Sequence, residues 1–149
     1  MIDETDRQII ALMAKGGGIT QKQIAKKAGL TAPAISSRIQ KLRAGGVLLG
    51  FSPIISMDKL GYDITVLVNA RIRNGKLVEA GEKYSKEPGV CSTYTVTGEY
   101  DMVLVAKFHN TKELEGWNQK MTQDTEFIER INTSLVFTTQ KEGTNPNGI

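Results

Sequence analysis

The sequence predicts an α+β protein made of two unlike parts, with three short helices in front and alternating strands and helices behind them. In the front part, apolar residues recur at the spacing of amphipathic helices. In the back part, β-branched runs with period-two alternation are separated by helical patterns and glycine turns. The two patterns meet at a Gly61-Tyr62 turn. We therefore expect two modules joined by a linker within the 149 residues.

Three helices account for the front part. The second is expected to end at Gly29 and the third at Gly45-Gly46, because glycine readily takes the left-handed conformation that ends a helix. Each helix has an apolar side that can pack against the other two. The apolar positions are Ile9, Leu12 and Met13, then Ile24, Ala25 and Ala28, then Ile35, Ile39 and Leu42.

The start of each helix is marked by a side chain that can accept a hydrogen bond from the first turn of backbone. The second helix has the pattern of a capping box, and the third carries proline in its first turn. The capping residues are Asp3 or Thr5 for the first helix, Thr20 with Gln23 for the second, and Thr31 ahead of Pro33 for the third.

The run QKQIAKKAGLTAPAISSRIQ, residues 21–40, is typical of a helix-turn-helix. Ala25 is small enough to let two helices approach steeply, Gly29 supplies a positive φ, and Ile35 anchors the second helix against the first. A rotation of ~100° per residue places polar residues on the outward face of the third helix, as in a recognition helix. The outward residues are Pro33, Ser37, Gln40 and Lys41, and the flanking ones are Ser36, Arg38 and Arg43.

Charge separates the two parts more clearly than the net charge of +3 suggests. Residues 7–57 contain eight Lys or Arg residues and no Asp or Glu, whereas residues 61–149 carry ten basic and twelve acidic residues. A small helical packing unit whose charged residues are merely solvated would normally carry both positive and negative charges on its surface. A segment without acidic residues can instead bind a polyanion. We therefore predict that the front part binds double-stranded DNA.

The back part has the order β-α-β-β-α-β, which is that of the split-βαβ or ferredoxin-like domain, with two helices on one face of a four-stranded antiparallel sheet. Asn110 or Thr111 with Glu113 forms a capping box for its second helix. The segment VLLGFSPIIS, residues 47–56, also has a strand-like pattern and links the two parts. The predicted strands are 64–72, 90–97, 100–108 and 128–140, and the predicted helices are 75–86 and 111–124.

Several classes of function are excluded by the composition. Cys91 is the single cysteine and His109 the single histidine, so neither a disulfide framework nor a Cys/His zinc set is expected. No apolar run reaches the ~20 residues of a membrane span, and the acidic start MIDETDRQ is unlike a secretory leader, so we expect a cytoplasmic protein. An enzyme would have to use Glu99 and Asp101 as acid and base without a nucleophile, metal set or phosphate loop, so we predict neither catalysis nor a cofactor.

Five short segments occur in an order that points to one family. They are the acidic and apolar positions of residues 3–12, IAKKAGL at 24–30, Ile, Arg and Leu within 35–42, GVLLGF at 46–51, and TGEYD at 97–101. In this order they resemble the Lrp/AsnC family of transcription regulators, named after the leucine-responsive regulatory protein and also called feast/famine proteins. The resemblance extends over nearly the whole chain, and TGEYD is similar to the family's Gly-x-aromatic-Asp hairpin.

The resemblance implies an organisation for the whole chain. It places a winged or extended helix-turn-helix at 1–46, a strand linker at 47–60 and an ACT-related, ferredoxin-like RAM domain for regulation and oligomerisation at 61–141. The remaining residues, 142–149, contain turn formers and are predicted to be disordered. Family members pair into homodimers through their sheets, and dimers assemble into octamers or other rings, so the resemblance also implies self-association.

The resemblance further implies a small effector, usually an amino acid, bound between neighbouring regulatory domains near the hairpin. A turn glycine can expose backbone N–H groups to a carboxylate, and Asp101 can accept a hydrogen bond from an ammonium group. An ordinary hairpin turn with a satisfied carboxylate explains the same residues, and both interpretations stay open. The effector-binding residues that the family implies are Gly98, Glu99, Tyr100, Asp101, Thr133, Ser134 and Leu135.

Three functions follow from these observations. They are a sequence-specific regulator modulated by an effector, a low-specificity or effector-independent DNA-organising protein of the same build, and a small-molecule sensor or enzyme without DNA binding. Gly16-Gly17-Gly18 stands where relatives have an acidic residue and an arginine, so a phosphate contact expected there is missing. The predicted DNA-binding residues are Lys22, Thr31, Pro33, Ser36, Ser37, Arg38, Gln40, Lys41 and Arg43.

Overall fold

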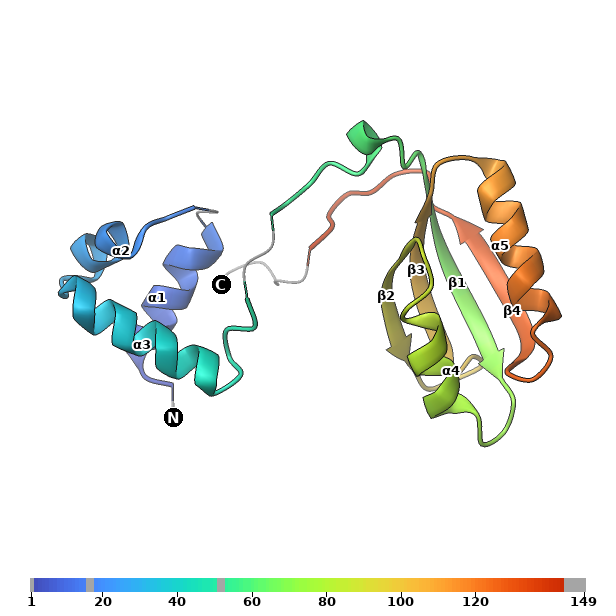
Figure 1. The fold of residues 1–149 in the computed structure, drawn as a ribbon, viewed down its shortest axis with the longest axis horizontal. Coiled ribbons are helices and arrows are strands. Elements are labelled where there is room, and N and C mark those ends of the chain that lie inside the picture. The colour runs from blue at the N-terminus through green and yellow to red at the C-terminus, as the bar shows by residue number, and fades with distance from the viewer. Residues whose placement is uncertain (1, 16–17, 51–52, 144–149) are drawn as a thin grey trace. The chain divides into compact units, whose positions relative to one another are not determined.

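The computed structural model describes residues 2–15, 18–50 and 53–143 (Figure 1). Contacts divide the chain into two compact units: the second spans Ser56–Gln140, and the first comprises the residues up to Ile55 together with those from Lys141 on, so that one boundary lies between Ile55 and Ser56. Each unit has a hydrophobic cluster of its own. The boundary lies inside the linker that we predict at 47–60. Gly16 and Gly17 of the predicted loop, and residues 144–149 of the predicted tail, lie outside the described residues.

The helical unit is formed by three helices around an apolar core. Ile9, Ile24 and Ile35, one from each helix, have exposed fractions of 0%, 1% and 0%. Burying a branched aliphatic side chain of this size contributes about 1.5–3 kcal/mol, so these residues hold the unit together. Six of the nine apolar residues predicted from the helical spacing are buried in this core, and Leu12, Met13 and Ala28 pack against it partly buried. The helices are α1 (Glu4–Lys15), α2 (Gln21–Ala28) and α3 (Ala32–Ala44).

The predicted caps of α2 and α3 are confirmed. Thr20 and Gln23 form the capping box, with the Gln23 N–H donating to Thr20 Oγ1 at 3.3 Å and the Thr20 N–H donating to Gln23 Oε1 at 2.9 Å. Gly29 ends α2 with a φ of 66°, as predicted. At the end of α3 the left-handed residue predicted at Gly45-Gly46 is Gly46, with a φ of 68°, whereas Gly45 has a φ of −81°. The difference arises because Gly45 continues the hydrogen bonding of the last turn.

The strand-like segment after α3 forms no strand in its described residues, 47–50 and 53–56. Leu49 and Ile54 have exposed fractions of 92% and 102%. An apolar alternating pattern shows which residues suit a strand, but a strand also needs a neighbour to complete its backbone hydrogen bonds. The pattern therefore predicts the wrong element here, and it leaves two large apolar side chains uncovered.

The second unit is a four-stranded antiparallel sheet with two helices, in the predicted order, and a short 3-10 helix, η1 (Asp58–Leu60), precedes it. The spatial order of the strands is β2-β3-β1-β4, which is the ferredoxin-like arrangement. The last strand is shorter than predicted, because its pairing with β1 ends at Leu135. The elements are β1 (Ile64–Ile72), α4 (Leu77–Tyr84), β2 (Val90–Thr95), β3 (Met102–Phe108), α5 (Thr111–Gln123) and β4 (Ile128–Leu135).

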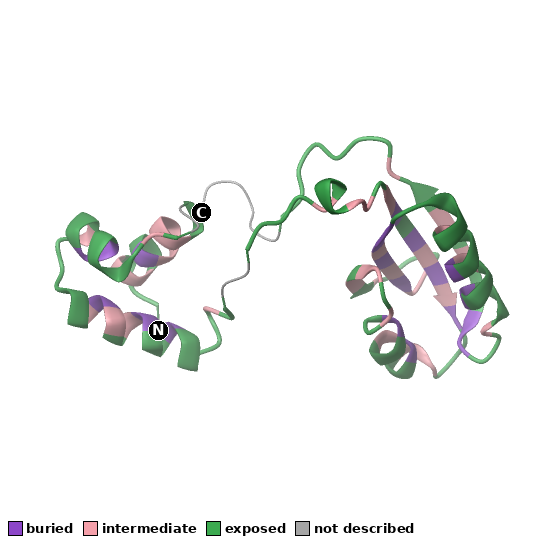
Figure 2. Ribbon diagram, turned by 45° about the horizontal axis from the view of Figure 1, so that its top comes forward, coloured by how far each residue is buried: buried purple, intermediate pink, exposed green. Residues whose placement is uncertain are grey.

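The two faces of the sheet differ. Helices α4 and α5 lie on one face, and the alternate residues of β1 and β3 that point to them are buried (Figure 2). On the opposite face, which no helix of the described residues covers, Leu67 and Tyr94 are 40% and 55% exposed and Val103 and Val105 are half-buried. These four residues come from the three neighbouring strands β1, β2 and β3 and share one side of the pleat. We call them the open sheet face.

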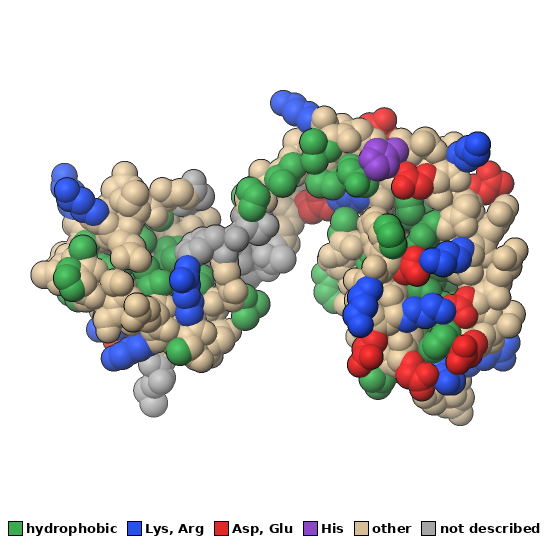
Figure 3. Space-filling view, viewed as in Figure 1, with side chains coloured by type: hydrophobic (Ala, Val, Ile, Leu, Met, Phe, Trp, Pro, Cys, Tyr) green, Lys and Arg blue, Asp and Glu red, His purple; other side chains and the backbone are tan. Residues whose placement is uncertain are grey.

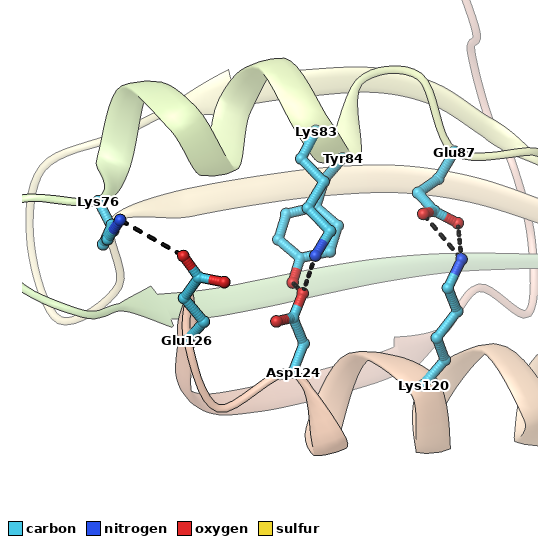
Figure 4. A network of polar contacts seen from close by, with 7 residues as sticks. All are labelled: Lys76, Lys83, Tyr84, Glu87, Lys120, Asp124 and Glu126. Carbon is cyan, nitrogen blue, oxygen red and sulfur yellow. Dashed lines mark hydrogen bonds and ion pairs between the residues drawn. The ribbon is translucent and has the colours of Figure 1, made fainter.

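Polar contacts tie α4 and the following turn to α5 and the turn after it (Figure 4). The carboxylate of Asp124 accepts hydrogen bonds from the Tyr84 hydroxyl at 2.6 Å and from Lys83 Nζ at 2.5 Å. Lys120 pairs with Glu87 at 2.8 Å, and Lys76 pairs with Glu126 at 3.4 Å. These contacts join the two helices to each other.

Candidate nucleic-acid interface and effector site

The outward face of α3 has the exposure that a recognition helix needs. Pro33, Ser37, Gln40 and Lys41 are all exposed, whereas Ile35, Ile39 and Leu42 are buried in the core of the unit. The buried stripe therefore fixes which side of α3 faces outward. Among the other predicted DNA contacts, Lys22, Thr31 and Arg43 are exposed and Ser36 is half-buried.

Thr31 is exposed, and its side chain also has a structural role. Its Oγ1 accepts a hydrogen bond from the Ala34 N–H at 3.4 Å, so its side chain caps α3. The backbone at this end of α3 has no acidic residue in its first turn. The positive end of the helix dipole is therefore uncompensated there, which favours an anion such as a phosphate.

The two units differ in surface charge. In Figure 3 the charged side chains visible over the helical unit are almost all Lys or Arg, whereas acidic and basic side chains alternate over the sheet unit. This matches the sequence, in which residues 7–57 carry eight basic residues and no acidic one. The helical unit therefore offers the positive surface that binding to DNA requires.

Arg38 is engaged inside the helical unit. Its Nη1 donates to Asp3 Oδ2 at 2.6 Å and to Asp6 Oδ1 at 2.8 Å. The hydrogen bond that Arg38 donates lowers the pKa of Asp3, and the two hydrogen bonds that Arg38 donates to Asp3 and Asp6 raise the pKa of the guanidinium. The predicted DNA contact thus lies on the flank of α3 that faces the start of α1.

Asp3 and Asp6 also organise the start of α1. The Asp6 N–H donates to Asp3 Oδ1 at 2.8 Å, and the Asp3 N–H donates to Asp6 Oδ2 at 3.2 Å. This reciprocal pair is a capping box with aspartate at both positions, and it selects Asp3 over Thr5 as the cap. One arrangement of carboxylates therefore caps α1 and holds Arg38.

The predicted hairpin is tied to the ends of two strands by arginines. Asp101 accepts hydrogen bonds from the Ile72 N–H at 2.8 Å and from Arg71 Nη1 at 3.2 Å. Arg71 Nη1 also donates to the Glu99 carbonyl at 3.1 Å, and Arg130 Nη2 donates to Glu99 Oε1 at 2.6 Å. The carboxylate of Asp101 is thus satisfied by its own chain.

Arg71 and Arg130 contact the hairpin but are not among the residues predicted for this site from the sequence. They are opposite each other in the register of β1 and β4, and Arg130 lies over the ring of Tyr100 at 5.1 Å. Two like charges in one cross-strand pair are unfavourable unless anions lie beside them. In this chain Glu99 and Asp101 supply the anions. The signal in the sequence is one arginine near the end of the first strand and one near the start of the last.

Thr133, Ser134 and Leu135 do not join the hairpin within one chain. They pair with Val68, Leu67 and Val66, whereas the Asp101 N–H donates to the carbonyl of Ala70, farther along β1. The structure therefore brings together Glu99, Tyr100 and Asp101 and leaves the predicted facing stretch elsewhere on β4. Thr133 and Leu135 instead border a groove beside α5, together with Leu114, Asn118 and Phe137.

Among residues 2–15, 18–50 and 53–143, no three His, Cys, Asp or Glu side chains are grouped so that they could hold a metal ion. In the same part of the chain, no helix is long and apolar enough to cross a membrane.

Both units match known family models. Residues 2–48 match the winged helix-turn-helix DNA-binding model, and residues 65–146 match the Lrp/AsnC ligand binding domain. The HTH-type transcriptional regulator FL11 of Pyrococcus furiosus is 32% identical over 144 residues, which are 97% of this chain and 95% of that protein.

Solved structures show the same fold. Escherichia coli AsnC superposes with a TM-score of 0.87 at 21% identity and covers 97% of this chain and 98% of its own. The transcriptional regulator NMB0573 of Neisseria meningitidis, crystallised as a complex with L-Met, gives a TM-score of 0.86 at 20% identity over 97% of this chain and 95% of its own. At these identities the likeness concerns the fold.

Proposed function

The chain belongs to the Lrp/AsnC family of DNA-binding transcription regulators, which are not enzymes, and from this premise we propose that it is a sequence-specific regulator modulated by an amino acid. The observation that carries the DNA part of the proposal is the exposed polar face of α3 on a unit with eight basic residues and no acid between residues 7 and 57. The proposal includes a cytoplasmic location, where a bacterial or archaeal regulator would meet DNA.

The DNA interface divides by chemistry. Ser37 and Gln40 can exchange hydrogen bonds with base edges in the major groove, and Lys41 can bind phosphate or guanine. Lys22 and Arg43 lie on the same unit and can neutralise phosphates. Pro33, Thr31 and Ser36 complete the surface at the start of the helix. Base contacts by only a few side chains leave part of the specificity to the shape of the DNA.

The DNA part is tested by selecting binding sites from random duplexes and mapping the selected site by footprinting. Paired recognition helices of a homodimer should select a palindrome with half-sites about one helical turn apart, near 34 Å. Lys41→Ala should weaken binding to this site, whereas Lys86→Ala in the sheet unit serves as the matched control. Equal affinity for unrelated duplexes with no selected palindrome would instead favour the low-specificity DNA-organising protein.

The effector part rests on the hairpin and the two arginines. A free amino acid carries one carboxylate and one ammonium group, and the hairpin region offers arginines for the first and carboxylates for the second. Glu99 is the more exchangeable partner, because its side chain is 69% exposed while that of Asp101 is 28% exposed. We assign the effector to Gly98, Glu99, Tyr100 and Asp101, with Thr133, Ser134 and Leu135 supplied by a neighbouring subunit. The L-Met complex of the Neisseria protein supports an amino acid as the effector class.

Calorimetric titration with each of the twenty amino acids tests this assignment. One or a few should bind the wild-type protein, and Arg130→Gln should weaken binding because the carboxylate loses a charged donor. Lys112→Gln, on the exposed side of α5, is the matched control. If no amino acid binds, the effector is removed from the proposal and the DNA-binding regulator stands.

Self-association is the third part of the proposal. The open sheet face places Leu67, Tyr94, Val103 and Val105 at a surface, and a homodimer would cover them with the same face of a second copy. Rings of such dimers, including an octamer, would bring the hairpin of one subunit near β4 of another. Light scattering should give a multiple of the 16.3 kDa chain, and Tyr94→Glu should lower that multiple.

The three parts combine in one coupling. An effector bound between subunits stabilises the arrangement of subunits that it fits best. By linkage, the factor by which the effector changes the affinity for DNA equals the factor by which DNA changes the affinity for the effector. The sign of this effect is measured by repeating the DNA titration with the effector at saturation.

A further inference from the structure

Arg38 differs from the other basic residues of α3 in its burial. Lys41 and Arg43 are exposed, whereas Arg38 is half-buried with 33% of its side chain accessible. A single nitrogen, Nη1, donates to carboxylates of Asp3 and Asp6 that are 35 and 32 residues away in the sequence. These contacts join the middle of α3 to the start of α1.

The charge around Arg38 argues against a phosphate contact. One guanidinium and two carboxylates give this group of three residues, Asp3, Asp6 and Arg38, a net charge of −1. A phosphate that reached the guanidinium would also meet Asp3, whose side chain is 53% exposed. Like charges at this range repel, and the repulsion would offset the attraction to Arg38.

The burial of Asp6 shows that the carboxylates are held in place. The Asp6 side chain is 13% exposed, and its backbone N–H is bound by Asp3 at 2.8 Å. Charged hydrogen bonds with partly buried acceptors are stronger than those on an open surface. Arg38 is therefore fixed from two sides rather than extended toward solvent.

We infer that Arg38 is a positioning residue, which sets the orientation of α3 against α1 through Asp3 and Asp6 while its neighbours Ser37, Gln40 and Lys41 contact the DNA. This replaces the direct DNA contact predicted for Arg38 from the sequence. It adds Asp3 and Asp6, two acidic residues, to the set on which DNA binding depends.

The test uses variants that keep the charge of the group constant. The double variant Asp6→Asn with Arg38→Gln removes one negative and one positive charge, so long-range attraction to DNA is unchanged. We call it the neutral double variant, because both substituted side chains are uncharged. Binding to a 30-base-pair duplex of mixed sequence is measured by fluorescence anisotropy over a range of salt concentrations, at a temperature where circular dichroism shows every variant folded.

The neutral double variant should lose affinity roughly tenfold at every salt concentration, which corresponds to the usual coupling between groups in contact. Its slope of log affinity against log salt should equal that of the wild type. Lys41→Gln, the positive control for a phosphate contact, should lower the slope by about 0.9 for each phosphate that is no longer neutralised. A lower slope in the double variant, or an unchanged affinity, would overturn the positioning role.

A charge-swapped variant separates the two roles further. Asp6→Arg with Arg38→Glu restores an ion pair between α1 and α3 and again keeps the net charge. If Arg38 positions the helix, the swap should recover affinity relative to the neutral double variant. If Arg38 contacts DNA, the swap should bind more weakly than the neutral variant, because a carboxylate would then face phosphate.

Discussion

At the scale of residues, a few charged groups stabilise the sheet unit, and their burial decides how much each contributes to the free energy of unfolding. Asp124 is one of these, because it accepts hydrogen bonds from both Tyr84 and Lys83. Burial alone would raise the pKa of Asp124, but the hydrogen bonds from Lys83 and Tyr84 lower it below its usual value. Burial and the same hydrogen bond raise the pKa of Tyr84.

These shifts predict a stability that depends on Asp124 and on pH. Asp124→Ala should lower the free energy of unfolding by about 1–3 kcal/mol, because it leaves the buried Tyr84 hydroxyl without its acceptor. Glu126→Ala is the control and should cost at most about 1 kcal/mol, since that carboxylate is 65% exposed. Urea unfolding at neutral pH measures both.

The pH dependence has a definite sign. Because the pKa of Asp124 is lowered by folding, its contribution is complete above the unfolded-state pKa near 3.9 and is lost as pH falls through the lower folded value. Unfolding curves of wild type and Asp124→Ala should therefore converge toward acid. Curves that stay equally far apart at low pH would contradict the assignment.

At the scale of elements, the entry to β2 depends on a close approach of two backbones. Gly89 has a φ of 81°, and a Cβ there would lie 2.7 Å from the carbonyl oxygen of Lys107. In return, the Lys107 N–H donates to the Gly89 carbonyl at 2.8 Å. This bond joins the turn to β3 next to the irregular start of the β2–β3 pairing, between Val90 and Ser92.

Gly89→Ala should therefore destabilise the sheet unit by more than a positive φ alone explains. Gly75 is the matched control, with a φ of 79° and nothing within 4 Å of an added Cβ. Gly75→Ala should cost about 1–2 kcal/mol, and Gly89→Ala distinctly more, because rigid backbone must move. Thermal unfolding of the two variants gives the comparison, and equal losses would show that the contact is relieved without cost.

At the scale of the whole molecule, the described residues form two cores with no buried residue in common. Within residues 2–15, 18–50 and 53–143, the core of the helical unit contains six buried apolar residues and that of the sheet unit fourteen. Because the cores are separate, each unit should unfold in a transition of its own. Because each core is small, each unit should have a low free energy of unfolding. Their different surfaces fit the division between DNA binding and regulation that we propose.

Calorimetry of the whole protein should therefore show two transitions. Leu42→Ala, in the core of the helical unit, should lower the first transition and leave the second in place, because removing such a side chain costs about 2–5 kcal/mol. Leu104→Ala is the counterpart in the sheet unit and should lower the second. A single transition that moves with either variant would mean that the units are energetically coupled.

Much of the fold is predictable because it depends on local patterns. The helical stripes, the capping box at Thr20 and the order of helices and strands along the chain follow from neighbours a few residues apart, and all are confirmed. The expectation of a strand at 47–56 is wrong for its described residues, since a strand needs a partner that the pattern does not specify.

The sequence by itself determined the fold class of the two units, the outward face of α3, and the separation of charge between the units. Only the tertiary structure decided which charges meet. Arg38 is taken by Asp3 and Asp6, and Arg71 and Arg130 face each other across two strands beside the hairpin. The reason is physical: a periodic pattern fixes which side of an element is buried, but an ion pair depends on register and packing between segments that lie about 30 or more residues apart in the chain.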